Sequence, residues 1–121
     1  MEDVCCPDLN DALEQMILTR GLPYSGRVVY ACTEGPRFET AAEVRMFRTL
    51  GAQIIGMTLV PEAPLARDLG MNYAALGIIA NYCTGMTSYV TDDGIENVIR
   101  GMRESVFELC FDFIKNASNQ P

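Results

Sequence analysis

The sequence predicts an α/β fold with a largely parallel sheet and helices packed on its faces. Short apolar runs bounded by turn residues indicate buried strands, and the segments between them repeat apolar residues at helical spacing. Strand and helix alternate three times, a pattern that favours parallel strands joined by helical crossovers. A length of 121 residues is enough for one buried core, so we expect residues 1–121 to form a single domain.

Capping and turn residues set the limits of each expected element. Asp8 can cap the first helix, which should end at Gly21. Thr40 or Glu39 should begin the second helix, with Gly51 as its stop. The full expected order is helix 8–21, strand 28–32, helix 39–51, strand 53–57, helix 61–70, strand 73–79, a last helix capped by Asp92 or Asp93, and a frayed tail 116–121.

Loops that follow the three predicted strands suggest where a ligand binds. These loops begin after Cys32, after Ile55 and after Ile79. In a parallel sheet ligands bind beyond the carboxyl ends of the strands. The sequence therefore predicts a binding site at one edge of the sheet.

Composition excludes several classes of function. The net charge of −7, with no basic run, argues against nucleic acid or an anionic membrane as a partner. The absence of His and of any Cys-x-x-Cys pair argues against a zinc site, and we expect no metal. Five irregularly spaced cysteines, no signal peptide and no membrane-spanning stretch indicate a cytoplasmic protein with reduced thiols.

Three segments, in their order and spacing, carry a family resemblance. They are Glu34–Glu43 (EGPRFETAAE), Gly56–Glu62 (GMTLVPE) and Ile79–Tyr82 (IANY). Together they resemble the C-terminal half of the trimeric purine nucleoside phosphorylase / methylthioadenosine phosphorylase family, from about Glu2 to about Phe113. The resemblance implies phosphorolysis of a purine nucleoside in purine salvage. Inorganic phosphate would be the co-substrate, without a metal or organic cofactor.

The resemblance places two residues of the first segment on the base. Phe38 would pack on the purine face, or alternatively fill the mouth of the sheet. Glu39 matches the glutamate of the purine nucleoside phosphorylases, where the methylthioadenosine branch often has a small residue. An ionised carboxylate only accepts hydrogen bonds, so Glu39 suits the protonated N1 of a 6-oxopurine better than the bare N1 of adenine. Glu39 could also serve as an acid at a helix N-terminus.

The third segment supplies the residue that would act on the leaving group. Asn81 matches the family position that addresses purine N7 and the C6 substituent, and it is our candidate catalytic residue. A carboxamide can donate to N7 and tolerate a 6-oxo group, whereas Asp suits adenine. Adenine-specific relatives often have Asp two positions further on, where this chain has Cys83. By the same resemblance Tyr82 and Cys83 line the substrate site.

The resemblance also assigns the sugar and phosphate contacts. Met57 would pack on the ribose, and the Thr58 hydroxyl would bind phosphate. Ile95, Val98 and Ile99 form an apolar stripe that matches the trio around a 5′-methylthio group, although any packed helix shows such a stripe. With no His to meet a 5′-hydroxyl, the chain is closest to the methylthioinosine phosphorylase branch.

The resemblance covers only the C-terminal half of the family's sequence. The family draws most of its phosphate contacts from Gly/Ser-, Arg-His- and Thr-bearing loops in its N-terminal half, which has no counterpart in this sequence. We therefore weigh an alternative, a non-catalytic fragment or a lobe that requires a partner, and expect either a homo-oligomer (a trimer in the family) or association with a missing N-terminal half. An adenine-specific methylthioadenosine phosphorylase is a further alternative.

Overall fold

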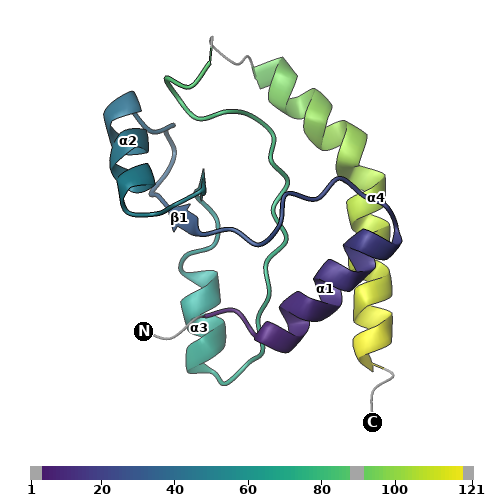
Figure 1. Cartoon of the computed structure of the whole chain (residues 1–121). Coiled ribbons are helices and arrows are strands. Elements are labelled where there is room, and N and C mark those ends of the chain that lie inside the picture. The colour runs from purple at the N-terminus through teal and green to yellow at the C-terminus, as the bar shows by residue number, and fades with distance from the viewer. Residues whose placement is uncertain (1–3, 88–91, 119–121) are drawn as a thin grey trace.

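The computed structural model describes residues 4–87 and 92–118, in which four helices surround a small sheet (Figure 1). Its two strands pair in parallel, with Tyr30 opposite Ile54 and Cys32 opposite Gly56. The predicted α/β class with a parallel sheet is confirmed. The elements in chain order are α1 Pro7–Thr19, β1 Tyr30–Cys32, α2 Ala41–Thr49, β2 Ile54–Gly56, α3 Glu62–Asp68 and α4 Asp92–Ser118.

The third predicted strand, 73–79, is not formed. Within the described residues, Tyr73 C=O accepts a hydrogen bond from the Cys6 N–H at 2.7 Å, and the backbone of residues 74–80 makes none. A strand exists only when a neighbour completes its ladder. The apolar run reveals the tendency to form a strand but cannot reveal whether a neighbour is present, so this prediction is wrong for the chain as it stands.

Two predicted helix limits also need correction. The N-cap of α1 is Cys6 with Pro7 in the first turn, because proline at that position has no N–H to satisfy; Asp8 lies inside the first turn instead. Helix α4 continues to Ser118, so the tail does not fray from residue 116 as predicted, and 119–121 lie outside the described residues. The predicted cap of α4 by Asp92 or Asp93 also lies outside the described side chains.

The best-buried cluster lies where α1 crosses α4. Leu13 and Ile17 of α1 pack with Leu109 of α4, which is fully buried. Arg20 at the end of α1 forms an ion pair with Asp112 of α4. Figure 1 shows this helix pair on the side of the molecule opposite α2, with the 73–80 segment between them. The loops at the edge of the sheet are therefore formed by residues other than those of the cluster between α1 and α4.

Among the described residues, no helix has both the length and the hydrophobicity needed to cross a lipid bilayer.

Candidate functional site

Two loops leave the sheet at the carboxyl ends of β1 and β2. The Thr33 N–H donates to the Gly56 C=O at 2.9 Å, which extends the pairing one residue past β1. The loop then folds over β2, since a methyl group placed on Gly35 would lie 3.0 Å from the Met57 sulfur. Gly35 therefore permits a close approach to Met57, which is 41% exposed at the same edge.

Hydrogen bonds connect the loop 33–40 to the start of α2. Thr40 is the N-cap and forms a reciprocal capping box with Glu43. Of the two starts that the sequence predicts, Thr40 and Glu39, the helix therefore uses Thr40. Arg37 donates to both Glu43 carboxylate oxygens, at 2.9 and 2.6 Å, and to the Phe38 C=O at 3.1 Å. These bonds hold the backbone on both sides of Phe38 and Glu39.

The stability that these hydrogen bonds contribute depends on pH through Glu43. The hydrogen bonds from Arg37, then those from the Thr40 N–H and hydroxyl, lower the pKa of Glu43 to about 2. A carboxylate with a depressed folded-state pKa stabilises the fold above its unfolded pKa. That contribution is lost as the pH falls from about 4.5 to about 2.

Removing the cap should weaken the protein measurably. Thr40→Ala is expected to lower the free energy of unfolding by about 1 kcal/mol at pH 7, whereas Thr40→Ser, which keeps the hydroxyl, should change it little.

Glu43→Gln should flatten the loss of stability between pH 4.5 and 2 in urea titrations followed by circular dichroism. Glu96→Gln, in the exposed ion pair with Arg100, is the matched control. Equal pH profiles for the two glutamine variants would contradict this role of Glu43.

Glu39 is the buried acid of the site. Its side chain is only 9% exposed, and one carboxylate oxygen accepts a hydrogen bond from the Thr33 hydroxyl at 2.7 Å. An acidic group so placed needs hydrogen-bond donors, because burying an unpaired polar group is costly. Phe38, by contrast, is 56% exposed, so it does not serve as a plug for the sheet. Its ring is available at the surface beside Glu39.

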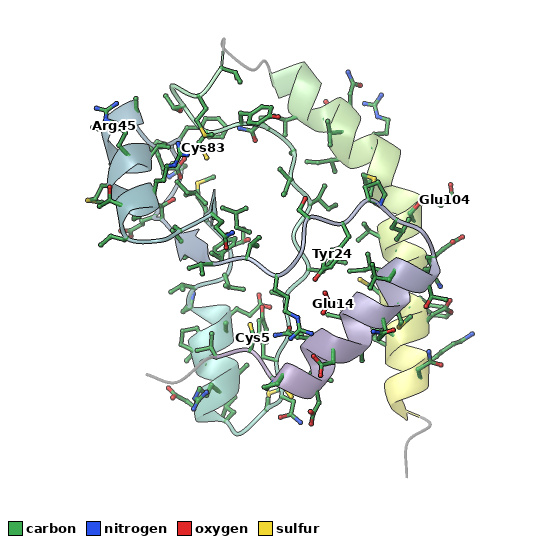
Figure 2. The ribbon with its side chains drawn as sticks, in the orientation of Figure 1. Cys5, Glu14, Tyr24, Arg45, Cys83 and Glu104 are labelled. Atoms are coloured by element: carbon green, nitrogen blue, oxygen red, sulfur yellow. The ribbon has the colours of Figure 1, made fainter. Side chains whose placement is uncertain are left out.

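The segment 81–86 lies against the same corner. A methyl group on Gly85 would lie 2.8 Å from the Ala41 methyl, so this segment rests on the first residue of α2. Figure 2 shows Cys83 next to α2. Burial raises the pKa of the Cys83 thiol, and the negative charge of Glu39 raises it further, which places the thiol near that carboxylate.

Asn81 begins this segment and is half-buried. Its side-chain NH₂ donates to the Tyr82 C=O at 2.9 Å, and an amide nitrogen has a second N–H to offer. Tyr82 itself is 65% exposed. Asn81 and Cys83 therefore belong to one loop, which meets the Glu39 corner at Gly85 and Cys83.

Two contributors to this corner were not predicted from the sequence. Thr33 orients the Glu39 carboxylate, and the Tyr30 ring lies over Gly56, where a methyl group would be 2.1 Å from the phenolic oxygen. The same oxygen accepts a long hydrogen bond of 3.5 Å from the Thr58 N–H, so Tyr30 helps to position Thr58. A lone glycine within a strand, as Gly56 is, signals a close neighbour of this kind.

The apolar trio of α4 is not brought to the Glu39 corner. Val98 and Ile99 are 40% and 44% exposed, and Ile95 is half-buried. Figure 1 shows α2 and α4 on opposite sides of the 73–80 segment. Val98 instead lines a cavity of about 720 Å³ that Thr58 also reaches.

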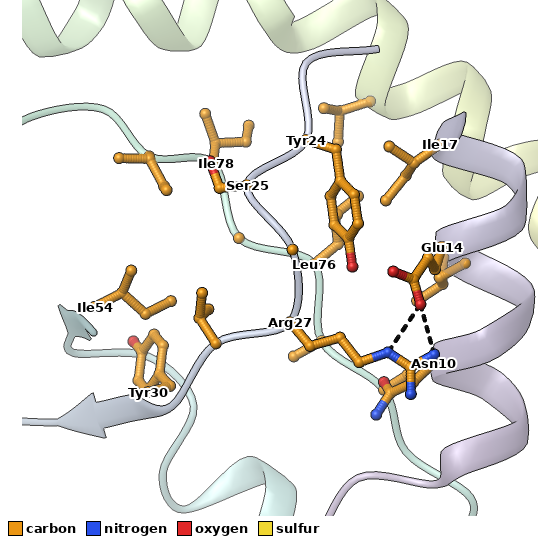
Figure 3. A pocket seen from close by; sticks show the side chains of 18 of the residues that line it. Asn10, Glu14, Ile17, Tyr24, Ser25, Arg27, Tyr30, Ile54, Leu76 and Ile78 are labelled. Carbon is orange, nitrogen blue, oxygen red and sulfur yellow. Dashed lines mark hydrogen bonds and ion pairs between the residues drawn. The ribbon is translucent and has the colours of Figure 1, made fainter. Parts of the chain in front are cut away.

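That cavity lies between segments 22–28 and 73–79, with α1 and α4 at its sides (Figure 3). Arg27 donates to Glu14 at 3.0 and 2.7 Å, and the Tyr73 hydroxyl donates to Glu62 at 2.7 Å. That last bond, with burial, raises the pKa of Tyr73 to about 12. Of the predicted site residues the cavity takes in Thr58 and Val98 but not Glu39 or Asn81, so it is not the predicted base pocket.

Comparison with known proteins identifies relatives. Residues 1–115 match the sequence profile of the phosphorylase superfamily. The chain is 45% identical over 105 residues to the 6-oxopurine nucleoside phosphorylase of Pyrococcus furiosus, covering 86% of this chain and 40% of that protein. It is 43% identical over 110 residues to a probable S-methyl-5′-thioinosine phosphorylase of Methanosarcina acetivorans, covering 90% of this chain and 42% of that protein.

A solved structure has a similar fold. The methylthioadenosine phosphorylase of Schistosoma mansoni, in complex with adenine, superposes with a TM-score of 0.88 at 22% identity. The match covers 100% of this chain and 49% of that one. The chain thus spans less than half the length of each of these three proteins. With a family profile that matches nearly its whole length, the chain belongs to the phosphorylase superfamily, as its three sequence segments predict.

Proposed function

We propose that this chain forms the nucleoside-binding part of a purine nucleoside phosphorylase, a pentosyltransferase. With a complete phosphate site, it would split a 6-oxopurine nucleoside into the free base and ribose 1-phosphate or its 5-methylthio analogue. The observation that carries this proposal is the buried Glu39 carboxylate at the carboxyl edge of the sheet, held by Thr33 at 2.7 Å.

Glu39 would select the base. The N1–H of hypoxanthine or guanine can donate to this carboxylate, whereas adenine presents a lone pair at N1. Thr33 already donates to one oxygen, which fixes the orientation of the group before the base arrives. A preorganised acceptor of this kind discriminates strongly, because an analogue that lacks the donor leaves a buried polar group unpaired.

Asn81 would stabilise the departing base. Breaking the ribosidic bond moves negative charge into the purine, so an N–H aimed at N7 is worth more in the transition state than in the ground state. The bond to the Tyr82 C=O uses one N–H of the Asn81 amide, and the other remains for N7. The loss of one such donor typically costs about 3 kcal/mol of barrier.

The names of the relatives support a 6-oxo base. The two sequence relatives are named for 6-oxopurine nucleosides and for methylthioinosine, and the base of inosine is itself a 6-oxopurine. The adenine complex comes from a structure at 22% identity, which supports the fold alone. Together with Cys83 where the adenine-specific branch often has Asp, this favours a 6-oxopurine enzyme over the methylthioadenosine alternative.

The sugar would lie across Met57 towards α4. Met57 is exposed at the edge beside Gly35, which supports a role in packing on a ribose. Val98 and Thr58 line one cavity, which supports a sugar whose 5′ end points towards the apolar stripe of α4. A 5′-methylthio group suits that stripe better than a hydroxyl.

Phosphate binding would need residues beyond this chain. Thr58 is the candidate ligand here, and one hydroxyl is a weak hold on a dianion against a net charge of −7. Nearby guanidinium groups are engaged: Arg37 binds Glu43, and Arg27 binds Glu14. We therefore favour the alternative in which this chain is a lobe that works only when the rest of the fold is supplied.

The proposal is tested by phosphate-dependent release of base from inosine, methylthioinosine and methylthioadenosine by the completed protein. Faster release of hypoxanthine than of adenine is expected. Equal efficiency on methylthioinosine and methylthioadenosine would contradict the assignments of both Glu39 and Asn81.

A further inference from the structure

Phe38 and Glu39 are neighbours in the chain but lie in opposite environments. Phe38 is 56% exposed, whereas Glu39 is 9% exposed and accepts a hydrogen bond from the Thr33 hydroxyl. Neither residue belongs to a helix or a strand, so no regular backbone hydrogen bonding fixes the peptide unit that joins them. The orientation of this pair therefore depends on other contacts.

Arg37 makes the contact that restrains this peptide unit. Its guanidinium donates at 3.1 Å to the Phe38 C=O, which is the carbonyl of the bond between Phe38 and Glu39. The same group donates to the two Glu43 carboxylate oxygens at 2.9 and 2.6 Å. Because a peptide unit is planar, a bond to its carbonyl restrains the whole unit. Arg37 thus connects the Phe38–Glu39 peptide to α2.

The helix itself does not need Arg37 for its cap. The Thr40 hydroxyl accepts from the Glu43 N–H at 3.2 Å, and the Glu43 carboxylate accepts from the Thr40 N–H at 2.8 Å. The Arg37 side chain is 61% exposed, and exposed ion pairs contribute little to stability. The bonds of Arg37 therefore matter more for the position of the residues before the cap than for the stability of α2.

Arg37 is better suited to hold this loop than to bind a ligand. Both of its terminal nitrogens, Nη1 and Nη2, already donate to protein oxygens. The bonds to Glu43 raise the pKa of Arg37, and the negative charge of Glu39 also raises it, which places the guanidinium near both carboxylates. Two parallel bonds from an arginine to a carboxylate fix its direction, as a lysine ammonium cannot.

We propose that Arg37 is a positioning residue for base selection, which holds the Phe38–Glu39 peptide so that the ring and the carboxylate meet the same purine. The inference rests on the proposed function, in which these two side chains bind the base. A site discriminates well only when its supporting residues hold the contacting groups to within about 0.5 Å. Loss of Arg37 should therefore weaken the choice of base more than it weakens the fold.

Binding of the free bases tests the proposal without phosphate. Equilibrium dialysis of hypoxanthine and of adenine against the chain paired with the complementary portion of a relative gives the ratio of the two Kd values. Arg37→Gln should lower the preference for hypoxanthine by about fivefold or more, and Arg37→Lys should lie between this variant and the parent. Arg100→Gln, which breaks the exposed ion pair with Glu96, is the matched control and should leave the ratio unchanged. Full recovery of the ratio by Arg37→Lys would contradict the proposal, because charge alone would then suffice.

Proteolysis of the chain alone reports on the restraint of the loop. Chymotrypsin cleaves after exposed aromatic residues, and the bond after Phe38 belongs to the peptide unit that Arg37 restrains. Cleavage there should be faster in Arg37→Gln than in the parent and in Arg100→Gln, each rate being divided by that of a synthetic peptide 33–44 with the same residue 37. A fall in base preference without faster cleavage would indicate that Arg37 contacts the base directly, and it would overturn the positioning role.

Kinetics of the completed enzyme separate this role from phosphate binding. Arg37→Gln should raise the KM for methylthioinosine and leave the KM for phosphate unchanged. A rise in the KM for phosphate alone would make Arg37 a phosphate ligand and overturn the proposal. A parent that does not prefer hypoxanthine to adenine contradicts the proposed function together with this inference. A parent that prefers hypoxanthine, with the same ratio in Arg37→Gln, contradicts this inference alone.

Discussion

The chain alone is expected to release no hypoxanthine from inosine or methylthioinosine above the uncatalysed background, even with phosphate in excess. Catalysis of this reaction requires the phosphate to be held beside the sugar, and Thr58 is the one predicted phosphate ligand. Paired with the complementary portion of a relative, the same chain should turn over at an enzymatic rate, about 1 per second or more. The assay is coupled detection of free hypoxanthine.

The restored activity should depend on Thr58. Thr58→Val keeps the shape of the side chain but removes the hydroxyl, so it should raise the KM for phosphate more than the KM for the nucleoside. Thr49→Val is the matched control, because among the described residues the Thr49 hydroxyl bonds only to the Arg45 C=O within α2. Turnover of 1 per second by the isolated chain would show that the phosphate site is complete without a partner.

In the completed enzyme, Glu39→Ser combined with Asn81→Asp should move base preference from hypoxanthine towards adenine. Each substitution removes one match to a 6-oxopurine, and each mismatch leaves a buried polar group unsatisfied at about 1–3 kcal/mol. Each should therefore change the ratio of kcat/KM for methylthioinosine to that for methylthioadenosine by roughly 5- to 150-fold. The ratio is the measurement, because a general loss of stability affects both substrates equally.

Glu34→Ser is the control for this change. Glu34 lies in the same loop but is exposed, so its removal should leave the ratio unaltered. Thr33→Val tests the orientation of the carboxylate: it leaves Glu39 in place without the 2.7 Å hydrogen bond and should give a smaller shift than Glu39→Ser. An unchanged ratio in the double variant would remove the basis for a 6-oxopurine substrate.

Local features of the fold could be predicted because the residues that determine them lie close together in the sequence. The start of α2 at Thr40 follows from the capping box with Glu43, three residues apart. The strand 73–79 could not be predicted correctly, because pairing depends on a neighbour distant in sequence. The start of α1 was predicted incorrectly for a different, local reason, because the adjacent residues Pro7 and Asp8 are both start signals.

The candidate site could likewise be predicted only in part from the sequence. The loops after β1 and β2 could be placed at one edge, since parallel strands share a direction, and Gly35 and Met57 do meet there. The support from Thr33 and Tyr30 could not be predicted, because it depends on side-chain directions. The stripe of Ile95, Val98 and Ile99 identifies one face of α4 but not what that face meets, and the structure does not bring it to Glu39.

The exposed segment 74–80 also bears on the tendency of the chain to aggregate. No charged residue occurs anywhere between Asp68 and Asp92, so this stretch lacks the like-charge repulsion that keeps β-prone segments of different molecules apart. Seven apolar residues without proline are enough to stack into cross-β assemblies. The exposed apolar side chains of this stretch therefore make it a site through which copies of the chain can aggregate.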